Sequence, residues 1–221
     1  MDPQNNEHLP LELSSQLVSI MTTEHYNLQS GRSMTISESN GRSSLFVGAV
    51  SSGLIALTFV GQIAHLGTAF FVFSLIVIPT LLFMGLITFE RVLQAGSADI
   101  VYARGINRIR HLYLEYAPQM QPYFILSTHD DQEGTLGQEA MQTSWWQVFL
   151  SMAGMIAVIN SVLAGGFVGL LLAAFALPLW VTTSAGVVTF LLSVGLHQRY
   201  QWRQWMRLGR NLPVLFPSQP R

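Results

Sequence analysis

The sequence contains no cysteine and no lysine, and only 10% of its 221 residues are charged. Without cysteine the chain has no disulfide, no thiolate nucleophile and no cysteine ligands for zinc or iron–sulfur clusters. Soluble domains usually carry roughly 25% charged residues. The scarcity of charge, together with a mean hydropathy of +0.38, indicates an integral membrane protein. Because every basic residue is arginine, the composition is typical of a GC-rich bacterial genome.

All charged side chains fall outside two long stretches, Ser43 to Phe89 and Ala140 to Gln198. A helix that crosses a bilayer needs roughly 20 mostly apolar residues, so each stretch can cross twice. We therefore predict an all-α membrane protein with four transmembrane helices arranged as two helical hairpins, and with cytoplasmic amphipathic helices. The predicted organisation is a cytoplasmic region 1–43, a first hairpin 44–92 (spans 44–65 and 69–92), a cytoplasmic loop 93–144, a second hairpin 145–197 (spans 145–168 and 174–197) and a basic tail 198–221.

Arginines precede the first predicted span and follow the second and fourth, and they are absent from the connections within the two hairpins. Positive residues near the ends of spans mark the cytoplasmic face. We therefore expect both termini and the central loop to be cytoplasmic, in a bacterial inner (plasma) membrane. The first 43 residues have no basic segment followed by an apolar one, so we expect no cleaved signal peptide. The arginines that set this orientation are Arg32, Arg42, Arg91, Arg104, Arg108, Arg110, Arg199, Arg203, Arg207 and Arg210.

Small residues recur every four positions in two predicted spans, which places them on one helical face. Such faces allow close helix contact in lipid, either within one chain or between subunits. Beside the second face lies Asn160, which we expect to find an interhelical hydrogen-bond partner, either as a pore-lining or register-setting amide or as one buried hydrogen bond. The first face comprises Gly48, Ser52 and Ala56, and the second comprises Ala157, Ser161, Gly165 and Gly169.

Apart from Glu90 and Arg91 at the end of span 69–92, the predicted spans contain no Asp, Glu, Lys or Arg. Coupled transporters usually place ionisable groups on their pathway, so the sequence argues against that class. A channel can be lined by hydroxyl and amide groups, so the sequence is compatible with a channel. The apolar segment 165–178 either extends the two helices beside it or forms a re-entrant piece.

An amphipathic helix is predicted over residues 97–117, with Ser97 as its cap and Pro118 as its stop. Apolar and aromatic residues lie along one of its faces at alternating spacings of three and four. This stripe is a candidate oligomer or partner contact, although packing against the N-terminal region is an equal alternative. Its members are Tyr102, Ile106, Ile109, Tyr113 and Tyr116.

An imidazole and two carboxylates stand together at His129, Asp130 and Asp131. These groups could bind a divalent metal or act as a base. Adjacent loop residues rarely form a complete site, and local capping by Ser127, Thr128 or Asp130 is the favoured alternative. We therefore predict no catalytic residue, no metal site and no cofactor.

The tail carries basic and aromatic residues at helical spacing just after the fourth predicted span. Such a stripe suits anionic lipid headgroups, and it also serves simply to fix the topology. Nucleic acid is not needed to explain it. The candidate headgroup contacts are Arg199, Arg203, Arg207, Arg210 and Trp202.

The run GRSSLFVGAVSSGLIALTFVGQ and the segment YFILSTHDD resemble uncharacterised four-span membrane proteins of high-GC bacteria. This resemblance implies the fold and no activity. The layout of a cytoplasmic helix, a two-span hairpin and an amphipathic helix is similar to small membrane effectors of bacterial conflict systems, which are thought to oligomerise and breach the membrane. Only the first half of the chain fits that layout.

These patterns lead to three functional hypotheses. The first is a non-enzymatic, oligomeric inner-membrane protein that responds to a cytoplasmic signal or partner and forms a channel or pore. The second is a membrane scaffold or accessory subunit that does not conduct. The third is a membrane enzyme that acts on lipid. The expected partners are the bilayer with its anionic lipids, and further copies of the chain or another membrane protein.

Overall fold

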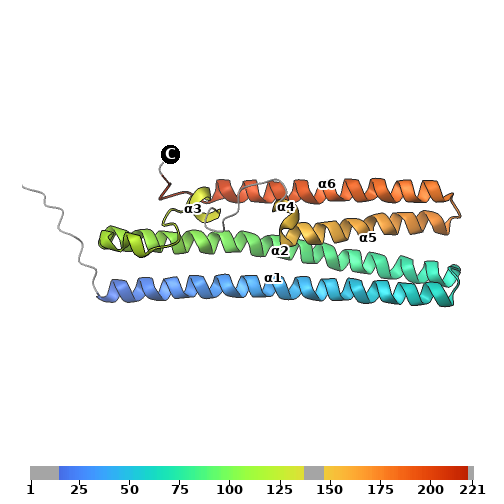
Figure 1. Ribbon diagram of the computed structural model, residues 1–221, viewed down its shortest axis with the longest axis horizontal. Coiled ribbons are helices and arrows are strands. Elements are labelled where there is room, and N and C mark those ends of the chain that lie inside the picture. Colours follow the sequence, from blue (N-terminus) through green and yellow to red (C-terminus); the bar gives the residue numbers. More distant parts are fainter. Residues whose placement is uncertain (1–14, 137–146, 219–221) are drawn as a thin grey trace, which may run out of the picture. The chain divides into compact units, whose positions relative to one another are not determined.

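A computed structural model describes residues 15–136 and 147–218 (Figure 1). All regular structure in these residues is helical, so the all-α prediction is confirmed for this part of the chain. The elements are α1 (Ser15–Ile63), α2 (Thr68–Tyr116), a 3₁₀ helix (Pro118–Tyr123), α3 (Gln132–Leu136), α4 (Gln147–Leu150), α5 (Met152–Ala174) and α6 (Leu179–Asn211).

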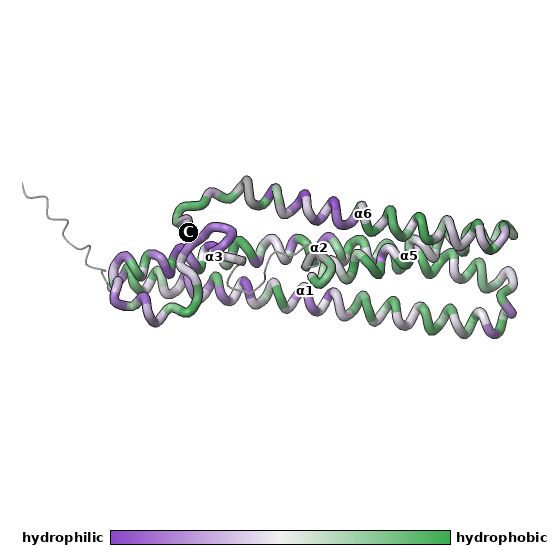
Figure 2. The backbone as a smooth tube through the Cα atoms, turned by 45° about the horizontal axis from the view of Figure 1, so that its top comes forward, coloured by the Kyte–Doolittle hydropathy of each residue, from purple (hydrophilic) through white to green (hydrophobic). Residues whose placement is uncertain are grey.

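Four of the helices, α1, α2, α5 and α6, are long and apolar enough to cross a membrane. This supports a multipass membrane protein. Apolar residues gather in the second half of α1, the first half of α2, α5 and the first half of α6 (Figure 2). α1 and α2 have 49 residues each. A helix of that size is about 74 Å long, whereas the hydrocarbon core is about 30 Å thick, so much of each helix lies outside it.

The chain divides into two compact units. Unit 1 takes in Met1–Met34, Ala98–Gln142 and Pro213–Arg221, and unit 2 takes in Thr35–Ser97 and Thr143–Leu212. The unit boundaries fall inside α1 and α2. Each of these two helices therefore contributes one part to each unit.

The helix start predicted at Ser97 is wrong, because α2 continues through this position without a break. The Ser97 hydroxyl donates back to the carbonyl of Leu93 at 3.0 Å, one turn earlier, and caps no helix. A single glycine at Gly96 costs a helix only about 1 kcal/mol, which is too little to stop it. The predicted stop is close to the observed one, since α2 ends at Tyr116 and Pro118 begins the 3₁₀ helix.

α5 begins at Met152, later than the predicted start of the third span, since Ser151 caps it. The Ser151 hydroxyl accepts a hydrogen bond from the backbone N–H of Gly154 at 3.0 Å. Residues 145 and 146 lie outside the described residues. α5 continues to Ala174, so most of segment 165–178 is regular helix. The connection to α6 is only the four residues 175–178, and Ala176 in this connection has a φ of 56°.

The core of unit 2 is apolar and is built mainly from α1, α2 and α5. Phe46, Phe89 and Ile156 are among its most buried residues, with exposed fractions of 2%, 5% and 0%. α5 and α6 lie side by side (Figure 1). They approach backbone to backbone at two glycines, where a Cβ added to Gly165 would lie 2.6 Å from the carbonyl oxygen of Gly186.

Candidate functional site

A fully buried amide, Asn160 of α5, lies at the meeting point of three helices in unit 2. Opposite it is Gly85 of α2. A Cβ added to Gly85 would lie 1.8 Å from Asn160 Oδ1 and 2.7 Å from the Phe46 ring of α1. Only glycine leaves room for the amide here, so Gly85 fixes how closely α2 approaches α5.

Neither Nδ2 nor Oδ1 of Asn160 has a hydrogen-bond partner within the described residues. The interhelical bond expected for this amide is therefore not formed there. The neighbouring Ser161 is satisfied, since its hydroxyl lies 2.7 Å from the carbonyl of Ala157 and 3.0 Å from the Ser193 hydroxyl of α6. An unsatisfied buried polar group costs about 1–3 kcal/mol. Asn160 is thus an unsatisfied polar group in an otherwise apolar core.

The two predicted small-residue faces have different surroundings. Ala157, Ser161 and Gly165 are buried, and a Cβ on Gly169 would lie 3.3 Å from the backbone of Thr182. Gly48 and Ser52, in contrast, are exposed, and a Cβ on Gly48 would meet nothing within 4 Å. The first face therefore does not pack within the described chain.

The sequence reasoning missed three contact glycines in unit 2: Gly53, Gly85 and Gly186. The side of α1 that faces α2 includes Gly53, where a Cβ would lie 2.7 Å from Leu81. Gly85 has no small residue four positions away, and Gly53 and Gly186 have only one each, so none of the three belongs to a stripe of three or more. A search for small residues at every fourth position therefore does not find them. The one sequence feature that points to a packing role is that each is a glycine within an uncharged span.

The predicted cluster at 129–131 anchors the C-terminal segment of unit 1. The Asp130 carboxylate, which is fully buried, accepts hydrogen bonds from the backbone N–H of Leu215 at 3.1 Å and of Phe216 at 2.8 Å. It also forms an ion pair of 2.7 Å with Nε of Arg108. The backbone N–H of Asp130 donates to the carbonyl of Phe216 at 3.1 Å. Segment 213–218 is thereby held against the loop.

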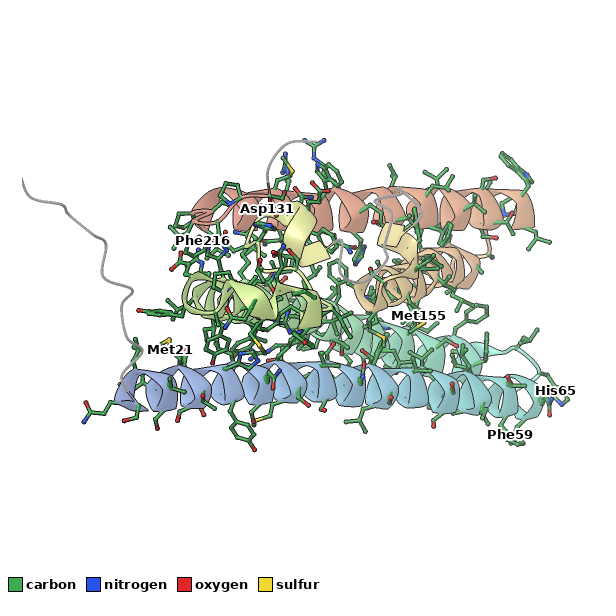
Figure 3. All side chains as sticks on the ribbon, turned by 60° about the vertical axis from the view of Figure 1, so that its left-hand side comes forward. Met21, Phe59, His65, Asp131, Met155 and Phe216 are labelled. Carbon is green, nitrogen blue, oxygen red and sulfur yellow. The ribbon has the colours of Figure 1, made fainter. Side chains whose placement is uncertain are left out.

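The neighbouring carboxylate, Asp131, caps α3 and holds the same segment. It accepts hydrogen bonds from the backbone N–H of Gly134 at 2.7 Å and of Ser218 at 2.7 Å, and another from the Ser218 hydroxyl. Figure 3 labels Asp131 in the loop and Phe216 in the C-terminal segment. From α2, the amide of Asn107 donates to the carbonyls of His129 at 2.8 Å and Gly134 at 3.2 Å, which fixes the loop.

The same hydrogen bonds set the ionisation of the two carboxyl groups. Burial alone would raise the pKa of Asp130, but the Phe216 and Leu215 N–H groups and the Arg108 guanidinium outweigh it and lower the pKa. The pKa of Asp131 is lowered in the same way, since its bonds from Ser218 and Gly134 outweigh the effect of burial. Both groups are therefore ionised at neutral pH.

The histidine and the two carboxylates do not converge on one point. Within the described residues, no group of three His, Cys, Asp or Glu side chains is placed to hold a metal. The ring nearest to the loop, His111, stacks on Phe216 with 3.9 Å between ring centroids. The capping role expected in this loop belongs to Asp131, and Ser127 accepts a hydrogen bond from the N–H of His129 at 3.0 Å. The arrangement serves to hold a peptide segment.

The aromatic stripe of α2 contacts the N-terminal part of α1 in unit 1. Ile106 and Ile109 are buried, and Tyr102 and Tyr116 are half-buried. A Cβ added to Gly31 of α1 would lie 3.0 Å from the Tyr102 ring. The Tyr113 ring lies parallel to that of His25, with their centroids 6.4 Å apart.

Arg32 and Asp99 add a two-point ion pair between these parts of α1 and α2, at 2.6 and 3.2 Å. Within unit 1 the stripe therefore packs on α1, which is the alternative that involves no second chain.

The basic stripe of α6 is exposed at Arg199, Trp202, Arg203 and Arg207. The side chain of Arg210 lies outside the described residues. A different face of α6 packs inside unit 2. On this face Gln201 is buried, and its amide donates to the Ser151 hydroxyl at 3.2 Å.

The sequence matches no protein-family model, no curated protein and no solved structure. The geometry of the two units is therefore the basis for the function proposed below.

Replacing Gly85 with alanine should destabilise unit 2 by about 1–3 kcal/mol, because the new methyl group overlaps the Asn160 amide. Adding Asn160→Ala to the same chain should restore most of the loss, although the Phe46 ring stays close. Thermal unfolding in a mild detergent measures both changes. Gly48→Ala is the matched control and should not destabilise the protein, because its methyl group meets nothing and alanine favours helix over glycine by up to about 1 kcal/mol. A Gly85→Ala protein as stable as the parent would contradict this packing.

Replacing Asp130 with asparagine should release segment 213–218, since hydrogen bonds to charged groups contribute about 1.5–3 kcal/mol each. Amide hydrogen exchange at Leu215 and Phe216 should accelerate about tenfold or more. In the parent protein the protection should persist from pH 7 to about pH 4. The protection should be lost only below pH 3.8, the usual pKa of an aspartate, as the pH falls through the lowered pKa of Asp130.

The exposed pair of Glu38 and Arg42 provides the control for this experiment. Glu38→Gln should leave exchange at Leu215 and Phe216 unchanged. If Asp130→Asn and Glu38→Gln gave equal exchange rates, the carboxylate would not anchor the segment.

Proposed function

We propose that this protein is a non-enzymatic, oligomeric multipass protein of a bacterial inner membrane that acts as a receiver or scaffold. Unit 2 anchors it in the bilayer as two helical hairpins, and unit 1 binds a cytoplasmic partner or signal. Both termini are cytoplasmic in this proposal. The exposed arginines of α6 contact anionic headgroups, each contributing about 1 kcal/mol near the surface.

The observation that carries the oligomer is an open apolar groove of about 570 Å³ along α5 and α6. Gly165, Gly166, Gly169 and Gly186 line it, and a Cβ on Gly166 would meet nothing within 4 Å. Helices associate in lipid through close backbone approach at small residues, since lipid provides no hydrophobic drive. A helix of a second copy has room to approach at Gly166, where the chain leaves the backbone uncovered.

A non-enzymatic role is supported by the use that unit 1 makes of its candidate catalytic groups. Asp130 and Asp131 already accept hydrogen bonds from Arg108 and from segment 213–218. A carboxylate held this way has a lowered pKa and is a poor base at neutral pH. These contacts favour a receiver over an enzyme that acts on lipid.

Conduction through the oligomer is a second candidate, and one observation favours it. Asn160 is a buried amide with no partner in the described residues. A water-filled pathway would satisfy its donor and acceptor groups. In this version, assembly or a cytoplasmic signal shifts α5 enough to hydrate Asn160.

Mass photometry in lipid nanodiscs tests the oligomer, and we expect a dimer or larger assembly. Gly166→Leu should convert it to monomer without unfolding it, because a Cβ at Gly166 meets nothing within 4 Å and the longer side chain occupies the open groove. Gly195→Leu is the matched control on α6, since a Cβ there also meets nothing within 4 Å. A strictly monomeric parent protein would contradict the proposal.

Liposomes that contain the purified protein then separate the two candidates. Sealed vesicles support the scaffold. Ion flux that disappears in Gly166→Leu and persists in Gly195→Leu supports the pore.

A further inference from the structure

The C-terminal segment 213–218 lies against unit 1 without regular secondary structure, beyond the end of α6. The carbonyl of Pro213 accepts a hydrogen bond from Arg108 Nη2 at 2.6 Å, and the carbonyl of Phe216 accepts one from the N–H of Asp130 at 3.1 Å. The backbone N–H groups that donate to the loop carboxylates are those of Leu215, Phe216 and Ser218. Proteins bind extended peptides through backbone contacts of this kind.

The segment contributes little to the apolar core of its unit. The side chains of Val214 and Leu215 are 42% and 55% exposed. Phe216 is half-buried and stacks on the His111 ring of α2, with 3.9 Å between ring centroids. No residue of the segment is among the buried apolar residues of the described chain. The segment can therefore leave without opening the core, because polar contacts and one aromatic ring hold it.

The loop that binds the segment is fixed by hydrogen bonds in which the segment takes no part. The Asn107 amide of α2 donates to the carbonyls of His129 at 2.8 Å and Gly134 at 3.2 Å. The carbonyl of Asp131 accepts from the N–H of Thr135 at 3.1 Å and from its hydroxyl at 2.7 Å. In the Asp131 carboxylate, Oδ1 caps α3, whereas Oδ2 binds the segment. The binding surface therefore keeps its shape when the segment leaves, and such preorganisation lowers the cost of binding a replacement.

An empty site would be costly, because it would leave a buried charge short of partners. Asp130 is fully buried, and the segment supplies two of its donors, the N–H groups of Leu215 at 3.1 Å and Phe216 at 2.8 Å. Without them Asp130 keeps the ion pair with Arg108 at 2.7 Å. A buried carboxylate is stable only when hydrogen bonds also satisfy its remaining lone pairs. The site therefore favours the exchange of one bound segment for another over vacancy.

The backbone contacts exclude proline at three positions of a bound peptide. The N–H groups that donate to the loop are those of residues 215, 216 and 218, and proline has no N–H group to donate. The two prolines of the segment, Pro213 and Pro217, stand at other positions. They also favour an extended backbone before binding, which reduces the entropy that binding costs. The sequence of the segment is therefore matched to the site at every position where an N–H group is bound.

Two side chains of the segment add selectivity. The Phe216 ring stacks on His111, so this position favours an aromatic residue. The Ser218 hydroxyl donates to Asp131 Oδ2, so this position favours serine or threonine. A peptide that fits the site is therefore extended, with an aromatic residue at the position of Phe216 and a hydroxyl two residues later.

We propose that this surface of unit 1 is a peptide-binding site. A partner protein that carries a segment of this pattern binds there and displaces segment 213–218, which acts as a built-in competitor. The inference deepens the proposed function, because it gives the chemistry of the partner that unit 1 receives. It rests on that function for its biological role, but the binding of a peptide does not require an oligomer. The residues of the site are Arg108 and His111 of α2 and Asp130 and Asp131 of the loop.

The test uses the full chain in lipid nanodiscs and, as the probe, a fluorescent peptide with the sequence of residues 213–218. The host chain carries Phe216→Ala and Ser218→Ala, which weaken its own segment and leave every residue of the site unchanged. Fluorescence anisotropy should show saturable binding to this host. The parent chain should bind the probe about tenfold or more weakly, because its intact segment occupies the site. Val214→Ala changes an exposed side chain of the segment, so this control chain should bind the probe as weakly as the parent does.

Changes in the peptide test the contacts without any effect on the folding of the protein. Leu215→Pro in the peptide removes one bound N–H group and should weaken binding about tenfold or more, since hydrogen bonds to charged groups are strong. Val214→Ala in the peptide should leave binding unchanged. Equal binding of these two peptides would overturn the proposal, and so would equal binding of the probe to the parent and to the weakened host.

A second arm identifies the source of the segment. Two differently tagged chains, one with His111→Cys and the other with Phe216→Cys, are reconstituted together and treated with a short bismaleimide; the chain has no native cysteine. We expect no crosslink between the two chains, whereas a chain with both substitutions should crosslink internally. A crosslink between the two chains would show that a second copy supplies the segment, and it would overturn the assignment to a different protein.

This inference and the proposed oligomer can fail independently. A chain that forms oligomers and binds no peptide would refute the peptide site alone, whereas a monomeric chain that binds the peptide would refute the oligomer alone. Mass photometry of the same nanodisc samples measures the oligomeric state and distinguishes the two results.

Discussion

The structure of unit 2 depends on close backbone approach between helices, which its glycines make possible. Helices in lipid gain little from burying apolar side chains, because the lipid tails are equally apolar. The distance to which two helix backbones can approach then decides how strongly they associate. Gly165 and Gly186 bring α5 and α6 together, and Gly85 leaves the space that Asn160 fills between α2 and α5. The same geometry that packs the core leaves Asn160 without a hydrogen bond, so close packing and an unsatisfied amide have one cause.

Unit 1 is held together by different interactions, and they are the ones expected where water is present. Asp130 pairs with Arg108, and Asp99 pairs with Arg32. Both carboxylates join segments far apart in the sequence, and Asp130 also holds the C-terminal segment through backbone N–H groups. Buried charges require this full set of partners, since each lost partner leaves an uncompensated charge.

The sequence was sufficient for the features that depend on local composition and insufficient for those that depend on distant contacts. The absence of charge between Ser43 and Phe89 and between Ala140 and Gln198 correctly located the four apolar helices. The predicted start at Ser97 failed because α2 has no strong break there. The contact at Gly85 and the docking of segment 213–218 were missed, since both join residues more than 70 positions apart. Capping patterns in the loop suggested a local role for its polar residues, but nothing in the sequence pointed to their distant partner.

The proposed topology has four helices that cross the membrane and all the charged regions on one side of it. The native chain has no cysteine, so single cysteines introduced at exposed positions can be labelled one at a time in intact cells with a membrane-impermeant maleimide. His65→Cys and Ala176→Cys, in the two connections, should react from outside. Ser30→Cys and Gln121→Cys should react only after the membrane is opened. Labelling of Ser30→Cys and His65→Cys from the same side of a sealed membrane would contradict the four-span account.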